Sequence, residues 1–285
     1  MPTPAGPRLI FEAQMTEVEP LSTSRGEAVA FSMRSPLKGT VNEDSAGFFP
    51  IGSQRAVLVV ADGLGGHASG AKASATAIRV LQQSIDSALT EADPDLRAAI
   101  LDGIEQANRA VISIGGGAAT TLSVVELDGN EVRSYHVGDS VFMMFGQRRK
   151  LKFLTVAHSP VGFAMEAGLM NEKEAMNHEY RHIVSNVIGS PDMRIEIGSS
   201  VKLSARDTLV VASDGLVDNL QTQQVVGRMA AGPLLPGAQA LAEEVRKRMI
   251  DPKNDQPSKA DDMTFLIYRP GLSPKAGPEE PTRPV

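Results

Sequence analysis

The stretch AVLVVADGLGGHASG, residues 56–70, decides how this chain folds and what it does. Its first six residues are all apolar and half of them are valine, a pattern typical of a buried strand. Asp62 ends that run, and four glycines and one histidine follow it within eight residues. A plain turn would account for an Asp-Gly pair. The alternative is that Asp62 and the backbone beside it hold something that a larger side chain would obstruct.

The composition is that of a soluble globular protein. Of the 285 residues 42% are hydrophobic and 22% are charged. The net charge of −6 predicts an acidic surface that repels phosphate backbones, so we expect no nucleic acid partner. The absence of cysteine excludes disulfides and thiolate chemistry. No apolar run is long enough for a signal peptide or a membrane helix, and we expect a cytoplasmic monomer with no membrane partner.

Strand and helix patterns together predict an α+β fold. Helical spacing of apolar residues runs through residues 77–85, 96–114 and 241–249. Short turns such as Asp128-Gly129-Asn130 join several of the strands, which favours antiparallel hairpins over a parallel sheet. The predicted strands are residues 27–33, 56–61, 120–127, 131–137, 140–145, 149–156, 195–203, 207–213 and 263–269.

The chain divides into one large domain and two ends. No repeat or linker interrupts residues 26–270, which we interpret as a single catalytic domain. Residues 1–25 are expected to be an N-terminal extension. Residues 271–285 are rich in proline, which cannot donate ladder hydrogen bonds, and are expected to be a disordered tail.

Four aspartates lie where a predicted strand begins or ends: Asp44, Asp62, Asp214 and Asp261. Each alone is explained by a turn or a helix cap. If two antiparallel sheets pack face to face, however, all four converge on one edge. Crowded carboxylates remain ionised together only when cations neutralise them. Oxygen ligands without cysteine favour a hard cation, Mg²⁺ or Mn²⁺.

Six short motifs follow one another in an order that resembles the metal-dependent Ser/Thr protein phosphatases of type 2C, the PPM family, in its bacterial form. Each motif alone is weak, but six in the same order are specific. The resemblance covers residues 27–269, and the motifs are NEDS (42–45), ADGLGGHASG (61–70), GAATT (117–121), HVGDS (136–140), SDGLVD (213–218) and DDMTF (261–265).

The resemblance implies a four-layer α-β-β-α sandwich, in which two antiparallel sheets are flanked by helices and a two-metal centre lies at one edge. Matched by motif, Asp62 would bridge the two metals and the Gly63 carbonyl would bind one of them. Asp44 would bind a metal largely through water, while Asp214 and Asp261 would complete the other metal's ligands. Gly63 is also suited to such a position because glycine accepts unusual backbone angles.

The implied reaction is hydrolysis of phosphoserine or phosphothreonine in proteins, the products of a Ser/Thr kinase, by a water that the metal pair activates. Asp139 would help to hold a third, weaker metal, as in bacterial relatives. His67 matches the motif histidine and is expected to protonate the departing serine or threonine oxygen. Asp62 and His67 are therefore the expected catalytic residues.

The chain departs from the family where substrate phosphate would be held. Gly39 stands where bacterial members carry an arginine, so Lys38 or Arg34 is expected to contact the phosphate instead. Val141 and Ala157 also replace polar residues of the family motifs. Residues 160–182 correspond to the family's variable flap, and we expect them to contribute to substrate selection.

Two alternatives remain open from the sequence. A member with weak or no turnover would act as a phosphoprotein-binding regulator, and the missing arginine favours this. A zinc protease would use the H-E-x-x-H pattern of His178, Glu179 and His182, provided that the segment is helical.

Overall fold

Two antiparallel sheets form the centre of the computed structural model, which describes residues 6–64, 68–253 and 256–271. The first sheet has the strand order β1-β4-β5-β8-β9-β12, and β13 pairs with β9. Its strands are β1 (Arg8–Phe11), β4 (Ser45–Ile51), β5 (Arg55–Ala61), β8 (Leu122–Asp128), β9 (Glu131–Val137), β12 (Glu196–Ile197) and β13 (Val201–Lys202).

The second sheet has the order β11-β10-β14-β15-β3-β2. Its strands are β2 (Glu19–Leu21), β3 (Glu27–Met33), β10 (Val141–Gly146), β11 (Leu151–Leu154), β14 (Asp207–Ala212) and β15 (Met263–Arg269). A small separate ladder joins β6 (Gly63–Leu64) to β7 (Ala119–Thr120).

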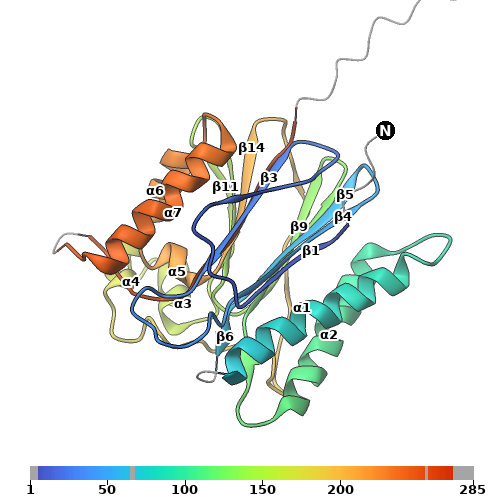
Figure 1. The fold of residues 1–285 in the computed structure, drawn as a ribbon, viewed down its shortest axis with the longest axis horizontal. Helices are drawn as coiled ribbons and strands as arrows, with labels where there is room; N and C mark the ends of the chain where they lie inside the picture. The colour runs from blue at the N-terminus through green and yellow to red at the C-terminus, as the bar shows by residue number, and fades with distance from the viewer. Residues whose placement is uncertain (1–5, 65–67, 254–255, 272–285) are drawn as a thin grey trace, which may run out of the picture.

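Helices cover the outer face of each sheet, as Figure 1 shows. The first sheet is covered by α1 (Ala68–Ala88) and α2 (Leu96–Ile114), and the second by α6 (Thr222–Met229) and α7 (Leu234–Ile250). Three shorter helices, α3 (Pro160–Glu166), α4 (Glu172–Met176) and α5 (Asp214–Val217), lie near one end of the second sheet. This four-layer arrangement confirms the predicted fold class.

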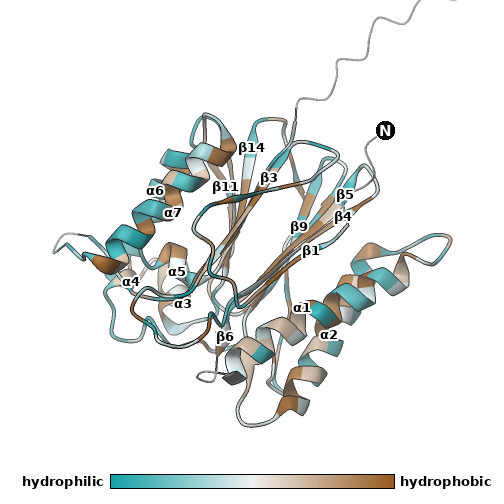
Figure 2. Ribbon diagram, in the orientation of Figure 1, coloured by the Kyte–Doolittle hydropathy of each residue, from teal (hydrophilic) through white to brown (hydrophobic). Residues whose placement is uncertain are grey.

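Three apolar clusters hold the layers together. One lies between the two sheets, and the other two lie between each sheet and its helices. Figure 2 shows the strands as mainly hydrophobic, while hydrophilic residues cover the outer faces of the helices. Strand β5 is buried on both faces: Val57 and Val59 pack under α1 and α2, and Leu58 and Val60 face the other sheet. That double burial explains its unbroken apolar sequence.

The N-terminal residues differ from the expectation. β1 pairs with β4 along Arg8–Phe11, and β2 pairs with β3 along Glu19–Leu21. Both strands are therefore part of the two sheets and do not form a separate N-terminal extension. Strand β4 was missed because Gly47 and Pro50 interrupt its pattern. The proposed disordered tail falls, apart from Gly271, outside the described residues. None of the helices in the described segments has the length and apolarity needed to cross a membrane.

Replacing Leu81 by alanine tests the packing of α1. This side chain is fully buried between the helices and the first sheet. We expect Leu81→Ala to lower the free energy of unfolding by about 2–5 kcal/mol in denaturant titrations. The control is Leu169→Ala, because Leu169 is 82% exposed and its loss is expected to change stability by less than about 0.5 kcal/mol. Equal effects of the two changes would contradict the packing described here.

Candidate metal centre

Antiparallel pairing brings the acidic residues to one edge of the sandwich. Ser45 at the start of β4 pairs with Ala61 at the end of β5, so Asp44 and Asp62 lie side by side just beyond the two strands. In the second sheet Ala212 pairs with Phe265, which places Asp214 and Asp261 at the adjoining ends of β14 and β15. The structure therefore assembles from four distant segments the cluster that the strand ends predict.

Hydrogen bonds from two threonines fix the backbone of Asp62. Its N–H donates to Thr121 Oγ1 at 2.9 Å, and its carbonyl oxygen accepts from Thr121 N at 2.9 Å and from Thr120 Oγ1 at 2.8 Å. Thr121 Oγ1 also lies 2.6 Å from Ser140 Oγ, next to Asp139. The GAATT and GDS motifs thus act together to position both aspartates.

Gly63 is required for close packing and not for unusual backbone angles. Its φ lies outside the left-handed region, contrary to the expectation from the sequence. A Cβ at this position would collide with the carbonyl group of Gly70 and lie 2.7 Å from Glu43 O. The start of α1 therefore lies directly against the residue that follows Asp62, and only glycine fits between them.

Asp44 has a buried oxygen that lacks a hydrogen-bond partner. The residue is 1% exposed, and its Oδ2 accepts from Ser213 Oγ at 2.7 Å, while Oδ1 has no hydrogen-bond partner among the residues that the structure describes. Asp214 Oδ1 is likewise buried and accepts no hydrogen bond from any described residue. Unsatisfied carboxylate oxygens are costly when buried, and a bound cation is one way to satisfy them.

The carboxylates repel one another strongly. Burial first, and then the charges of Asp44, Asp214, Asp261 and Asp139, raise the pKa of Asp62 well above its usual range. Burial and Asp214 raise the pKa of Asp139 to about 7. An oxygen-only cluster of this charge fits hard divalent cations such as Mg²⁺ and Mn²⁺.

A lysine lies within the cluster. Lys259 Nζ is 2.5 Å from Asp214 Oδ2, 2.8 Å from Asp218 Oδ2 and 3.1 Å from Asp261 Oδ2. Across the described ranges, no three histidine, aspartate or glutamate side chains are arranged closely enough to hold a metal ion by themselves. Asp214, Asp218 and Asp261 are thus brought together around an ammonium group, and the individual roles of the acidic residues as metal ligands stay predictions.

The residues expected to contact phosphate have different surroundings. Lys38 forms ion pairs with the buried carboxylates of Glu43 and Asp262, the latter at 3.0 Å. Arg34 is exposed to solvent. Their phosphate roles also stay predictions. His67, the expected proton donor, lies outside the described residues.

Sequence reasoning missed three charged residues at this edge. Asp218 lies four residues after Asp214, so a single helical turn carries both carboxylates to the same face. Lys259 lies two residues before Asp261, and this short spacing could have indicated that its positive charge lies beside the acidic cluster. Burial and the charge of Asp214 raise the pKa of Asp218 to about 6, and Arg181, which comes from the flap, lies close enough for its positive charge to oppose that rise.

The zinc-protease alternative is wrong. Its pattern requires a helix that places His178 and His182 on one face, but these residues lie in a series of turns after α4. His178 Nδ1 accepts a hydrogen bond from Tyr180 N at 3.1 Å. The segment is instead part of the flap.

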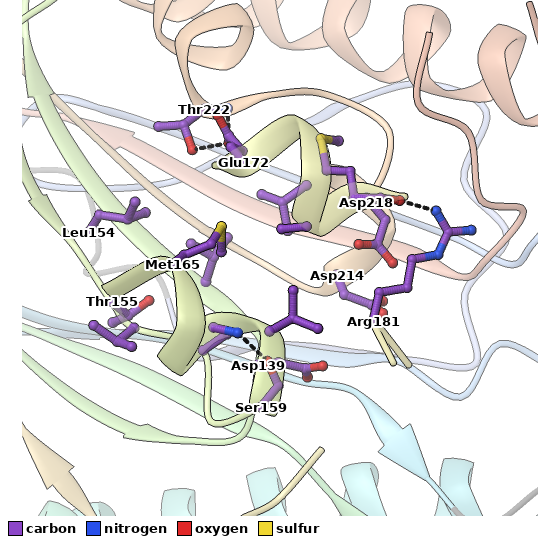
Figure 3. Close-up of a pocket in the computed structure, with 18 of the residues that line it drawn as sticks. Asp139, Leu154, Thr155, Ser159, Met165, Glu172, Arg181, Asp214, Asp218 and Thr222 are labelled. Carbon is purple, nitrogen blue, oxygen red and sulfur yellow. Dashed lines mark hydrogen bonds between the residues drawn. The ribbon is translucent and has the colours of Figure 1, made fainter. Parts of the chain in front are cut away.

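A cavity of about 450 Å³ extends from the acidic cluster beneath the flap. Figure 3 shows Asp139, Asp214 and Asp218 at one end, with Arg181 beside them. The remaining wall is largely apolar and comes from β10, β11, the flap and α5. Its apolar side chains include those of Val141, Leu154, Val161, Met165, Met176 and Val217.

The raised carboxyl pKa values predict a pH-dependent stability of the metal-free protein. Asp62 and Asp139 hold protons in the folded state at pH values where the unfolded chain has released them. The stability they contribute is therefore complete below the usual carboxyl pKa of 3.8 and is lost as pH rises through the folded-state values. Burial lowers the pKa of His136 to about 3, so this residue makes stability rise with pH. That rise ends at about pH 6.5, above which histidine is neutral in the unfolded chain as well.

Thermal unfolding in EDTA between about pH 7 and pH 8.5 isolates the carboxylates, because histidine is then neutral in both states. We expect the melting temperature to fall by about 1 °C over this range, because completing the ionisation of folded Asp139, whose pKa is about 7, costs ~0.4 kcal/mol. The variant Asp139→Asn should show a smaller fall. A melting temperature that rises steadily with pH would contradict the described cluster.

The family model of Protein phosphatase 2C matches residues 37–249 of this chain. The serine/threonine phosphatase stp of Listeria welshimeri is 30% identical over 186 residues, covering 62% of this chain and 73% of that protein. The protein phosphatase PhpP of Streptococcus pneumoniae is 27% identical over 194 residues, covering 66% and 78%.

Solved structures share the fold. The serine/threonine phosphatase of S. agalactiae has a TM-score of 0.70 and 25% identity, covering 89% of this chain and 98% of that one. The catalytic domain of the phosphatase PstP, solved with two manganese ions, has a TM-score of 0.67 and 23% identity, covering 86% and 98%. With the motif order, the four-layer fold and the acidic edge in agreement, the chain belongs to the protein phosphatase 2C family of serine/threonine phosphatases.

Proposed function

We propose that this protein hydrolyses phosphoserine and phosphothreonine in other proteins, with Mn²⁺ or Mg²⁺ bound at the acidic edge. The observation that carries the proposal is the convergence of Asp44, Asp62, Asp139, Asp214 and Asp261, with buried oxygens that lack partners. The two manganese ions of PstP, which shares the fold, support a pair of metal ions here.

Each residue of the edge has a proposed role. Asp62 would bridge two ions and the Gly63 carbonyl would bind one of them. Asp44 would act through water, Asp214 and Asp261 would complete the second ion's ligands, and Asp139 would help to hold a third. When bound, the ions supply a water of lowered pKa and neutralise the phosphoryl oxygens.

The chain supplies the proton and the phosphate contacts. His67 is proposed to protonate the departing serine or threonine oxygen. Arg34 is exposed and is available for a substrate phosphate, whereas Lys38 would have to leave two buried carboxylates first. Arg34 is therefore the preferred candidate of the two.

The proposed setting follows from composition. An acidic chain without cysteine is consistent with a cytoplasmic monomer that acts on the products of a Ser/Thr kinase and binds neither nucleic acid nor membranes.

The cavity beneath the flap is proposed to select substrates. Its acidic end, lined by Asp139, Asp214 and Asp218, is where the phosphorylated residue would react, and the rest of its wall is largely apolar. A large apolar side chain next to the phosphorylated residue would pack against that wall. Burying such a side chain is worth about 1.5–3 kcal/mol, enough to separate substrates about tenfold.

Changing Asp214 to asparagine tests the catalytic assignment. We expect Asp214→Asn to abolish Mn²⁺-dependent release of phosphate from a phosphothreonine peptide, with an unchanged circular dichroism spectrum. Asp192→Asn is the control, because Asp192 is exposed on the surface. Undiminished hydrolysis by Asp214→Asn would refute the assignment. A wild-type protein that binds the peptide without turnover would instead favour the regulator that the sequence left open.

Peptides that differ beside the phosphothreonine test the cavity. We expect the wild-type protein to prefer leucine over serine at that position by about tenfold in kcat/KM. Leu154→Ser combined with Met165→Ser should reduce this preference and leave hydrolysis of 4-nitrophenyl phosphate unchanged. Leu169→Ser is the matched flap control, since Leu169 is exposed and does not line the cavity. An unaltered preference in the double variant would exclude the cavity as the selecting site.

A further inference from the structure

Lys259 is surrounded by three carboxylates from two elements. Asp214 is the first residue of α5, Asp218 caps the C-terminal end of that helix, and Asp261 precedes β15. The lysine side chain is 20% exposed, and those of Asp214 and Asp218 are 16% and 15% exposed. An ammonium group this enclosed is held by charge in surroundings where water screens only weakly.

The backbone places Lys259 at this point. Its N–H donates to Asn219 Oδ1 at 3.0 Å, and its carbonyl oxygen accepts from Asn219 Nδ2 at 2.9 Å. Asn219 is fully buried and directly follows the turn that carries Asp218. These two hydrogen bonds with the Asn219 side chain therefore hold the loop of Lys259 against the segment that carries Asp214 and Asp218.

Among the described residues, no such cation lies against the rest of the cluster. Asp44, Asp62 and Asp139 form no ion pair with a described lysine, arginine or histidine, and Asp44 Oδ1 has no hydrogen-bond partner. The ammonium thus neutralises only the end of the cluster formed by Asp214, Asp218 and Asp261.

We propose that Lys259 is an internal cation that occupies the carboxylates of one metal position in the metal-free protein and competes with the divalent ion for them. This rests on the proposed function only in that Asp214 and Asp261 are metal ligands. The lysine stabilises the fold while the ion is absent and weakens the binding of the ion. Its flexible four-carbon stem allows the ammonium to move toward solvent when the ion binds.

Two consequences separate this role from a merely structural ion pair. Removing the charge lowers the stability of the metal-free protein, because the three carboxylates then repel one another without compensation. The same change strengthens metal binding, because the ion no longer displaces an ammonium. An ordinary stabilising ion pair would produce only the first effect.

The test uses Lys259→Met in the full chain, with thermal unfolding in EDTA and calorimetric titration of Mn²⁺. We expect a lower melting temperature without metal and an affinity for Mn²⁺ about tenfold tighter at one of the bound positions. Lys152→Met is the matched control: Lys152 is paired with Asp207 at 2.6 Å, at the opposite end of β14. This control should lose stability but bind Mn²⁺ as the wild type does.

Lys259→Arg and Lys259→Gln complete the series. The arginine variant keeps the charge and should retain weak Mn²⁺ binding, while the glutamine variant should resemble Lys259→Met and serves if the latter does not fold without metal. Mn²⁺ affinity that is unchanged or weaker in both uncharged variants would overturn the inference. Neither measurement involves turnover. An unchanged Mn²⁺ affinity would therefore leave the phosphatase assignment intact, and a protein without hydrolytic activity would still show whether Lys259 competes with Mn²⁺.

Discussion

Repulsion between carboxylates at one edge of the sandwich is the constraint on which this structure depends. Separate segments, each ending or beginning a strand, bring Asp44, Asp62, Asp214 and Asp261 together. The hydrogen bonds within any one of these segments do not offset this repulsion, so the free energy that holds the carboxylates together comes from the packing of the whole domain. The three apolar clusters that hold the four layers supply it.

The sequence predicted most of the frame because burial leaves a local signal. Strand β5 reads as an unbroken apolar run since both of its faces are covered, and the aspartates were recognisable because each interrupts such a run. Strand β4 was missed for the opposite reason: Gly47 and Pro50 give it no clear period, and its place is set by pairing with β1 and β5.

Contacts within the site were less predictable, because they depend on residues far apart in the chain. Gly63 was expected to adopt unusual backbone angles, yet its constraint is the approach of Gly70. The pattern from His178 to His182 suggested a helical metal site, but the flap folds into turns there. A short motif specifies side chains and their spacing, whereas the backbone beneath it is set by tertiary packing.

The two lysines at this edge show how charge is divided within it. Lys38 binds Glu43 and Asp262 on one side, and Lys259 binds Asp214, Asp218 and Asp261 on the other. Neither lysine pairs with Asp44 or Asp62, whose pKa values burial and neighbouring carboxylates raise. Within the described part of the chain, Lys38 and Lys259 thus neutralise the flanks of the cluster and leave the carboxylates at its middle without a paired cation. On the proposed function, a divalent ion would therefore be most strongly favoured at Asp44 and Asp62, and among the described lysines it would compete with an ammonium at the side of Asp214.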